Sequence, residues 1–171
     1  MKARTLTLLL VLGSSGLAEA GSVPVRARNS MVVSQNAIAS QVGASMLIGE
    51  GNAMDAAVAT AFALAVVHPS AGNIGGGGFL LYRSARGEAV AYDFRETAPA
   101  RASADMFLRD GQYDPALHHH SHLAVGVPGT VAGLHRAWRD HGNLPWEQLL
   151  EPAIALAREG FMAVSYTHLR A

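Results

Sequence analysis

A glycine-dense bend constrains the fold of this chain more than any other feature. Residues 53–67 contain almost no polar side chain, which predicts a helix buried on all sides. The glycine bend (Gly72–Gly78) follows, and glycine lets a backbone turn sharply and approach other segments closely. Two strand-like runs come next, Phe79–Arg83 and Ala89–Arg95, with a turn at 85–87. We therefore expect a buried helix to turn through the bend into a sheet.

Further elements are expected on both sides of this unit. Because Phe79–Arg83 is apolar on both faces, it should be a strand covered on both sides. Asn52 should cap the buried helix, with Asp55 in its first turn. The other expected elements are a strand at Met31–Val33, helices at Ala37–Ile48 (capped by Asn36), Ala104–Leu108 and Val131–His141, a loop at Arg109–Ser121, and a helical region from Pro145 to Gly160 that Pro152 kinks or divides.

The composition narrows the possible functions. The chain has 171 residues, of which 50% are hydrophobic, as expected for one folded domain. Its 13 basic residues balance 13 acidic residues, and no basic stripe indicates nucleic-acid binding. It has no cysteine, which excludes disulfides, thiol catalysis and cysteine-based zinc sites.

The first 20 residues have the pattern of a secretory signal peptide. Lys2 and Arg4 precede the apolar run Leu6–Leu12, and Ala18–Ala20 is a small-x-small cleavage site. The alternative is a membrane anchor, but the run is shorter than the roughly 20 residues that a span needs. We expect a mature chain that starts near Gly21, is periplasmic or secreted, and has no stable membrane span.

Arg95 is the sharpest binding candidate. It ends the second strand-like run, where a planar guanidinium can bind a carboxylate through two parallel hydrogen bonds. The alternative is an ion pair with Asp93 or Glu96, which spacing alone favours. The glycine bend is not followed by the Lys, Ser/Thr and helix of a phosphate-binding loop, so nucleotide binding is not expected. Its N–H groups can still stabilise an anion.

The histidines do not predict a metal centre. His118, His119, His120 and His122 crowd one polar loop, which suits adventitious binding better than a defined site. His68, at a helix end, is expected to be structural. A Ser–His–Asp triad has no support, since the chain lacks a Gly-x-Ser-x-Gly elbow. We expect no metal and no cofactor.

Four strings resemble the γ-glutamyltranspeptidase (glutathione hydrolase) family, in its order. The resemblance covers about Val25 to Phe161. The four strings are specific to the superfamily, but they distinguish this family less well from related acylases. The strings are GNAMDAAVA at 51–59, HPSAGNIGGGGF at 68–79, DFRETAP at 93–99 and HLAVGVPGTVAG at 122–133.

The resemblance implies an α+β fold, the αββα sandwich of N-terminal nucleophile hydrolases. It implies a precursor that cuts itself into a heterodimer of large and small subunits. The N-terminal threonine of the small subunit then attacks a γ-glutamyl amide, as in glutathione, and its α-amine serves as base. Water or an acceptor amine takes the γ-glutamyl group from the enzyme. By position, Arg95 would bind the α-carboxylate of this group, and Glu96 would orient Arg95.

The chain departs from the family by lacking the nucleophile, which lies downstream. None of the following threonines lies in a sequence context that matches the family's nucleophile: Thr60, Thr97, Thr130 and Thr167. We therefore expect residues 21–165 to be the N-terminal portion of the large subunit, and 166–171 to be a tail that does not match. Only part of the sandwich should be present, with exposed apolar faces prone to aggregation, and the chain alone should be inactive.

Two alternatives stay open. One is a related N-terminal nucleophile acylase of cephalosporin or glutaryl type, in which Arg95 would hold the carboxylate of a different acyl group. The other is a secreted, non-catalytic remnant that keeps the scaffold.

Overall fold

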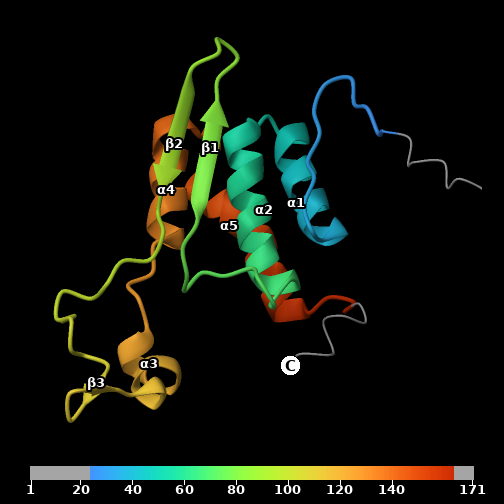
Figure 1. Ribbon diagram of the computed structural model, residues 1–171. Helices are drawn as coiled ribbons and strands as arrows, with labels where there is room; N and C mark the ends of the chain where they lie inside the picture. Colours follow the sequence, from blue (N-terminus) through green and yellow to red (C-terminus); the bar gives the residue numbers. More distant parts are fainter. Residues whose placement is uncertain (1–23, 164–171) are drawn as a thin grey trace, which may run out of the picture.

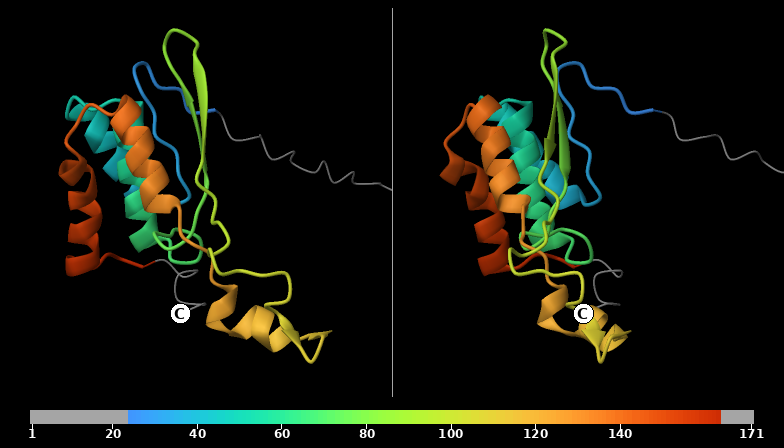
Figure 2. Two further views of the ribbon diagram at one scale, coloured as in Figure 1. Left: turned by 90° about the vertical axis from the view of Figure 1, so that its left-hand side faces the viewer. Right: turned by 60° about the vertical axis from the view of Figure 1, so that its left-hand side comes forward.

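Helix α2 (Ala53–Val67) is the centre of the fold. The structure is a computed structural model that describes residues 24–163 (Figure 1). Helix α2 packs against α1 (Ala37–Ile48), α4 (Thr130–His141) and α5 (Trp146–Glu159). Figure 2 shows α2 and α4 between α5 on one side and a β-hairpin on the other. The hairpin lies beside the glycine bend, so α2 leads directly into the sheet, as predicted.

The expected caps explain where α1 and α2 begin. The side chain of Asn36 accepts a hydrogen bond from the N–H of Ile38 at 2.8 Å. Asn52 accepts from Met54 and Asp55, and the Asp55 carboxylate accepts from the Asn52 N–H, which completes a capping box. Both predicted helices are confirmed, with the predicted bounds.

The apolar face of every long helix meets one core. Its largest fully buried apolar side chains are Met54, Leu149 and Val58. A smaller cluster joins Ala39 of α1 to α2. Nine of the 15 residues of α2 are buried, but Ala53 and Ala57 are exposed, so the prediction of a helix buried on all sides is only partly confirmed.

The hairpin is covered on one face only. Strands β1 (Phe79–Arg83) and β2 (Ala89–Asp93) are antiparallel, with Leu80 opposite Tyr92. Leu80 and Tyr92 pack against the core, whereas Phe79 and Leu81 are 67% and 84% exposed. The expectation that both faces of β1 are covered is therefore wrong for residues 24–163, because the helices lie on one side. The expected exposed apolar face is confirmed.

Residues 100–126 form an arm that projects from the helices (Figure 2). Here the predicted helix Ala104–Leu108 and the predicted loop Arg109–Ser121 are wrong. The arm contains a two-stranded hairpin and two short helices. They are β3 (Leu108–Arg109), β4 (Gln112–Tyr113), α3 (Pro115–His120) and the 3-10 helix η1 (His122–Ala124).

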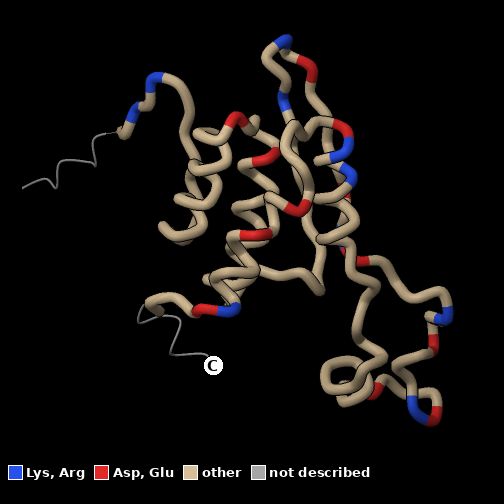
Figure 3. The backbone as a smooth tube through the Cα atoms, turned by 180° about the vertical axis from the view of Figure 1, so that it is seen from behind, with Lys and Arg blue, Asp and Glu red and all other residues tan. Residues whose placement is uncertain are grey.

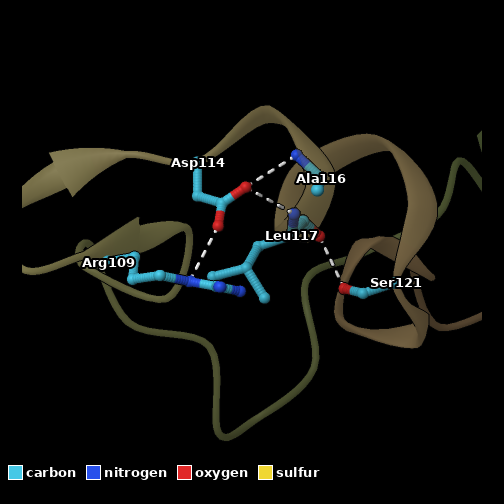
Figure 4. Close-up of polar contacts among 5 residues, drawn as sticks. All are labelled: Arg109, Asp114, Ala116, Leu117 and Ser121. Carbon is cyan, nitrogen blue, oxygen red and sulfur yellow. Dashed lines mark hydrogen bonds and ion pairs between the residues drawn. The ribbon is translucent and has the colours of Figure 1, made fainter.

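Local hydrogen bonds explain both errors in the arm. Residues 99–108 form successive turns, because the projecting segment has no core surface on which to lay an apolar helix face. Asp114 caps α3 by accepting from the N–H groups of Ala116 and Leu117, and its carboxylate pairs with Arg109 at 2.9 Å (Figure 4). Pro115 occupies the first turn of α3, a position that suits proline.

The structure differs from three further predictions, which concern a strand, a helix start and a helix interior. Residues Met31–Val33 belong to no strand, because none of the described segments pairs with them. Helix α4 begins one residue earlier than predicted, at Thr130. Pro152 lies inside α5 without dividing it. The predicted signal peptide (1–20) and the tail (166–171) lie outside the described residues.

The described chain carries no large region of one charge. Figure 3 shows basic and acidic positions interspersed along the backbone. None of the helices between residues 24 and 163 is both long and apolar enough to cross a bilayer.

Candidate functional site

Arg95 lies two residues beyond the end of β2, on the surface. Its backbone N–H donates to the Asp93 carboxylate at 3.0 Å. Within residues 24–163, no carboxylate forms an ion pair with its guanidinium, although Asp93 and Glu96 are near in sequence. The ion-pair alternative that spacing favoured is thus not formed in the described part of the chain.

The backbone around Arg95 is held by two segments far away in sequence. On one side, Gly78 and Phe94 exchange backbone hydrogen bonds of 3.4 and 3.1 Å. On the other side, Thr97 and Val127 exchange hydrogen bonds of 3.3 and 2.8 Å. The glycine bend and the start of α4 therefore flank the segment that carries Arg95.

Two glycines allow this close approach. A Cβ atom at Gly77 would lie 2.7 Å from both the Glu96 nitrogen and the Phe94 carbonyl oxygen. A Cβ atom at Gly129 would collide with the same carbonyl oxygen. The predicted role of the glycine bend, a close approach to another segment, is confirmed.

A cavity of about 540 Å³ opens beside Arg95. The end of β2 and the first turns of α4 line it, with Tyr92, Arg95, Pro128 and Arg136 among the lining residues. An open cavity with an arginine in its wall can accept a small anionic ligand.

The second arginine of the cavity is already paired. Arg136 donates to the Asp140 carboxylate at 2.9 Å, and the Tyr92 hydroxyl donates to the same oxygen at 3.1 Å. The hydrogen bond from Arg136 lowers the pKa of Asp140, and Asp140 raises the pKa of Arg136. Burial, followed by the bond to Asp140, raises the pKa of Tyr92. Arg95 is therefore the lining arginine without a carboxylate partner among the described residues.

The other sequence candidates do not join this site. His118 lies in the projecting arm, where its Nδ1 is 2.7 Å from the Tyr113 hydroxyl. Among residues 24–163, no three histidines or carboxylates are grouped so that they could hold a metal ion. The N–H groups of Gly76 and Gly78 are already bonded to Asn73 and Phe94, which weakens the glycine bend as an anion site.

Sequence reasoning missed two residues that bear on the site. Asn73 and Thr130 lie in the second and fourth matched strings, but neither their types nor their spacing of 57 residues predicts contact. The structure joins their side chains by a hydrogen bond of 2.7 Å.

Comparison with known proteins identifies the family. A sequence model described as Gamma-glutamyltranspeptidase matches residues 39–170. The chain is 53% identical over 150 residues to the glutathione hydrolase proenzyme of Escherichia coli (strain K12). This match covers 87% of the chain and 26% of the relative, so the chain spans about a quarter of that protein's length.

Solved structures agree with this match. The γ-glutamyltranspeptidase of Helicobacter pylori is similar with a TM-score of 0.77 and 48% identity, over 81% of this chain and 40% of that one. The cephalosporin acylase of Bacillus halodurans is similar with a TM-score of 0.65 and 27% identity, over 88% of this chain and 29% of that one. The predicted fold class, a partial N-terminal nucleophile hydrolase sandwich, is confirmed. Because the family model matches well over half of the sequence, the chain belongs to the γ-glutamyltranspeptidase family.

Proposed function

We propose that this chain is the N-terminal part of the large subunit of a γ-glutamyl hydrolase/transferase that acts on glutathione and other γ-glutamyl compounds. The 53% identity to a protein named glutathione hydrolase proenzyme supports the activity. The word proenzyme in that name supports processing of a precursor, and the family resemblance implies that the products are two subunits. The small subunit from the same precursor would then be the partner of this chain.

Arg95 is the residue that we propose binds substrate, through the α-carboxylate of the γ-glutamyl group. One observation carries this proposal: an exposed guanidinium without a carboxylate partner in the described chain lines a cavity of about 540 Å³. The guanidinium fork matches a carboxylate through two parallel charge-assisted hydrogen bonds. Glu96, beside the glycine bend, is a weaker candidate that would orient Arg95.

The nucleophile of the reaction would come from the small subunit. Two threonines of this chain have hydroxyls that are already engaged: Thr60 donates to the Ala56 carbonyl at 2.7 Å, and Thr130 donates to Asn73. Both are buried, which suits structural roles. The proposed reaction proceeds through a γ-glutamyl-enzyme formed on the downstream threonine and then hydrolysed or transferred to an amine.

Steady-state kinetics of the full-length proenzyme with Arg95→Lys tests the proposal. Lysine keeps the charge but loses the fork, so KM for a γ-glutamyl anilide should rise about 10- to 100-fold, the effect of losing a hydrogen bond to a charged group. Arg86→Lys, at the exposed tip of the β1–β2 hairpin, is the matched control and should leave KM unchanged. An unchanged KM in Arg95→Lys would return Arg95 to a structural role.

A related acylase of cephalosporin type is the second candidate. The similarity to the Bacillus halodurans cephalosporin acylase is the observation that supports it. That similarity is weaker, at 27% identity, than the 53% identity to the glutathione hydrolase, so the acylase ranks second. Arg95 would then hold the carboxylate of another acyl group. Turnover of glutaryl amides in preference to γ-glutamyl amides by the full-length enzyme would select this function.

Export is part of the proposal. The pattern of residues 1–20 supports a signal peptide and a periplasmic or secreted location. N-terminal sequencing of the protein recovered from its producing cell should begin near Gly21. A retained Met1 would contradict export by this route.

A further inference from the structure

A side-chain hydrogen bond ties the glycine bend to the start of α4. We propose that Asn73 and Thr130, which form it, are positioning residues for Arg95. This inference rests on the proposed function, because it assigns them a role in holding the arginine that binds the donor carboxylate. Neither residue lines the cavity beside Arg95, so they act through the backbone.

Asn73 Oδ1 is the centre of the connection. It accepts from the Gly76 N–H at 2.9 Å and from the Thr130 hydroxyl at 2.7 Å. Thr130 is only 7% exposed, so water cannot readily replace its partner. The amide of Asn73 therefore fixes the bend internally and joins it to α4.

Backbone hydrogen bonds reinforce the same junction. The Gly76 carbonyl accepts from the N–H groups of Gly129 and Thr130 at 2.8 and 3.0 Å. No side chain caps α4, so two of its first N–H groups are satisfied by the bend. The bend and the helix start behave as one unit rather than two loops.

This unit encloses the segment that carries Arg95. Gly77 lies against the Glu96 nitrogen and the Phe94 carbonyl oxygen, and Gly129 lies against the same oxygen from the α4 side. If Gly77 and Gly129 moved apart, the backbone of Phe94 and Glu96, on either side of Arg95, would lose these contacts and become free to shift. A bidentate contact depends on the position and angle of the guanidinium, so this loosening should weaken donor binding.

A matched pair of variants isolates the hydroxyl. Valine has nearly the shape of threonine but no hydroxyl, whereas serine keeps the hydroxyl. In the full-length proenzyme, Thr130→Val should raise KM for a γ-glutamyl anilide about five- to tenfold with kcat within about twofold, as expected for one lost hydrogen bond. Thr130→Ser should restore KM. A merely structural role would lower the amount of active enzyme, and hence kcat, with KM unchanged.

Asn73→Ala supplies a second route to the same answer. Asn73 is exposed, so this variant removes the acceptor without emptying a core position, and it serves if Thr130→Val fails to fold. It should also raise KM. In the Asn73→Ala background, Thr130→Val should add no further increase, because the bond is already lost.

The outcomes separate the two proposals. If Arg95→Lys leaves KM unchanged, the proposed role of Arg95 fails. If Arg95→Lys raises KM while Thr130→Val and Asn73→Ala do not, only the positioning role fails. Independent, additive effects of Asn73→Ala and Thr130→Val on KM would likewise overturn the positioning role.

Discussion

The carboxylate of Asp55 accepts hydrogen bonds from the backbone N–H of Asn143, which lies 88 residues further along the chain, at 3.1 Å to each oxygen. The same carboxylate accepts from the N–H groups of Asn52 at 2.8 Å and Leu144 at 3.3 Å. Asp55 is fully buried. One side chain thus caps α2 and fastens the α4–α5 connection to it.

Asp55→Asn should destabilise the full-length protein by about 2–4 kcal/mol. A carboxylate only accepts hydrogen bonds, whereas an amide at this fully buried position would turn an NH₂ group toward the N–H donors and leave some of them unpaired. The free energy of unfolding in urea measures the change. Asp110→Asn is the matched control: Asp110 lies in the β3–β4 turn with φ of 52°, a conformation that asparagine tolerates. Equal stability of the Asp55 variant and the parent would contradict this role.

Gly77→Ala should impair both stability and donor binding in the full-length enzyme. Its Cβ would meet backbone atoms of Phe94 and Glu96 at 2.7 Å, so the Arg95 segment must move, at a cost of about 1–3 kcal/mol. KM for a γ-glutamyl anilide and the thermal midpoint are the measurements. Gly75→Ala is the control in the same bend, because nothing lies within 4 Å of the added atom. Equal behaviour of the two variants would refute the close-approach argument.

The ion pair between Arg136 and Asp140 should make stability fall at acid pH. The folded state lowers the pKa of Asp140, chiefly through Arg136, so this contribution is present above the ordinary carboxyl pKa of about 3.9. This contribution is lost as the pH falls through the lowered pKa of Asp140, because the protonated carboxyl group no longer carries the negative charge that pairs with Arg136. Asp140→Asn should reduce the thermal midpoint at pH 6, and the difference from the parent should shrink as the pH approaches 3. A difference that stays constant over this range would show that the Asp140 charge contributes nothing.

The sequence by itself determined the four long helices, the bend and the choice of Arg95 as the binding candidate. The caps Asn36 and Asn52 act on N–H groups two or three residues away, so their effect can be read locally. The apolar run of α2 predicted the burial of most of its residues, because a helix without a polar face has no favoured side to leave in water. The matched strings, in turn, singled out Arg95.

Sequence reasoning failed where the deciding contact is absent or distant. The arm was misassigned because the cap and proline of α3, at Asp114 and Pro115, were not recognised, and because residues 104–108 have no surface to pack on. The exposed face of β1 depends on which side the helices lie, and the pattern of Phe79–Arg83 carries no such information.

Only the tertiary structure decided how the site is assembled. It placed the bend and the start of α4 on either side of Arg95, and it left that guanidinium without a carboxylate partner in residues 24–163. It joined Asn73 to Thr130 and Asp55 to Asn143. These pairs are 57 and 88 residues apart, and a hydrogen bond over such a separation follows from the packing of whole elements rather than from any local preference of the residues that make it.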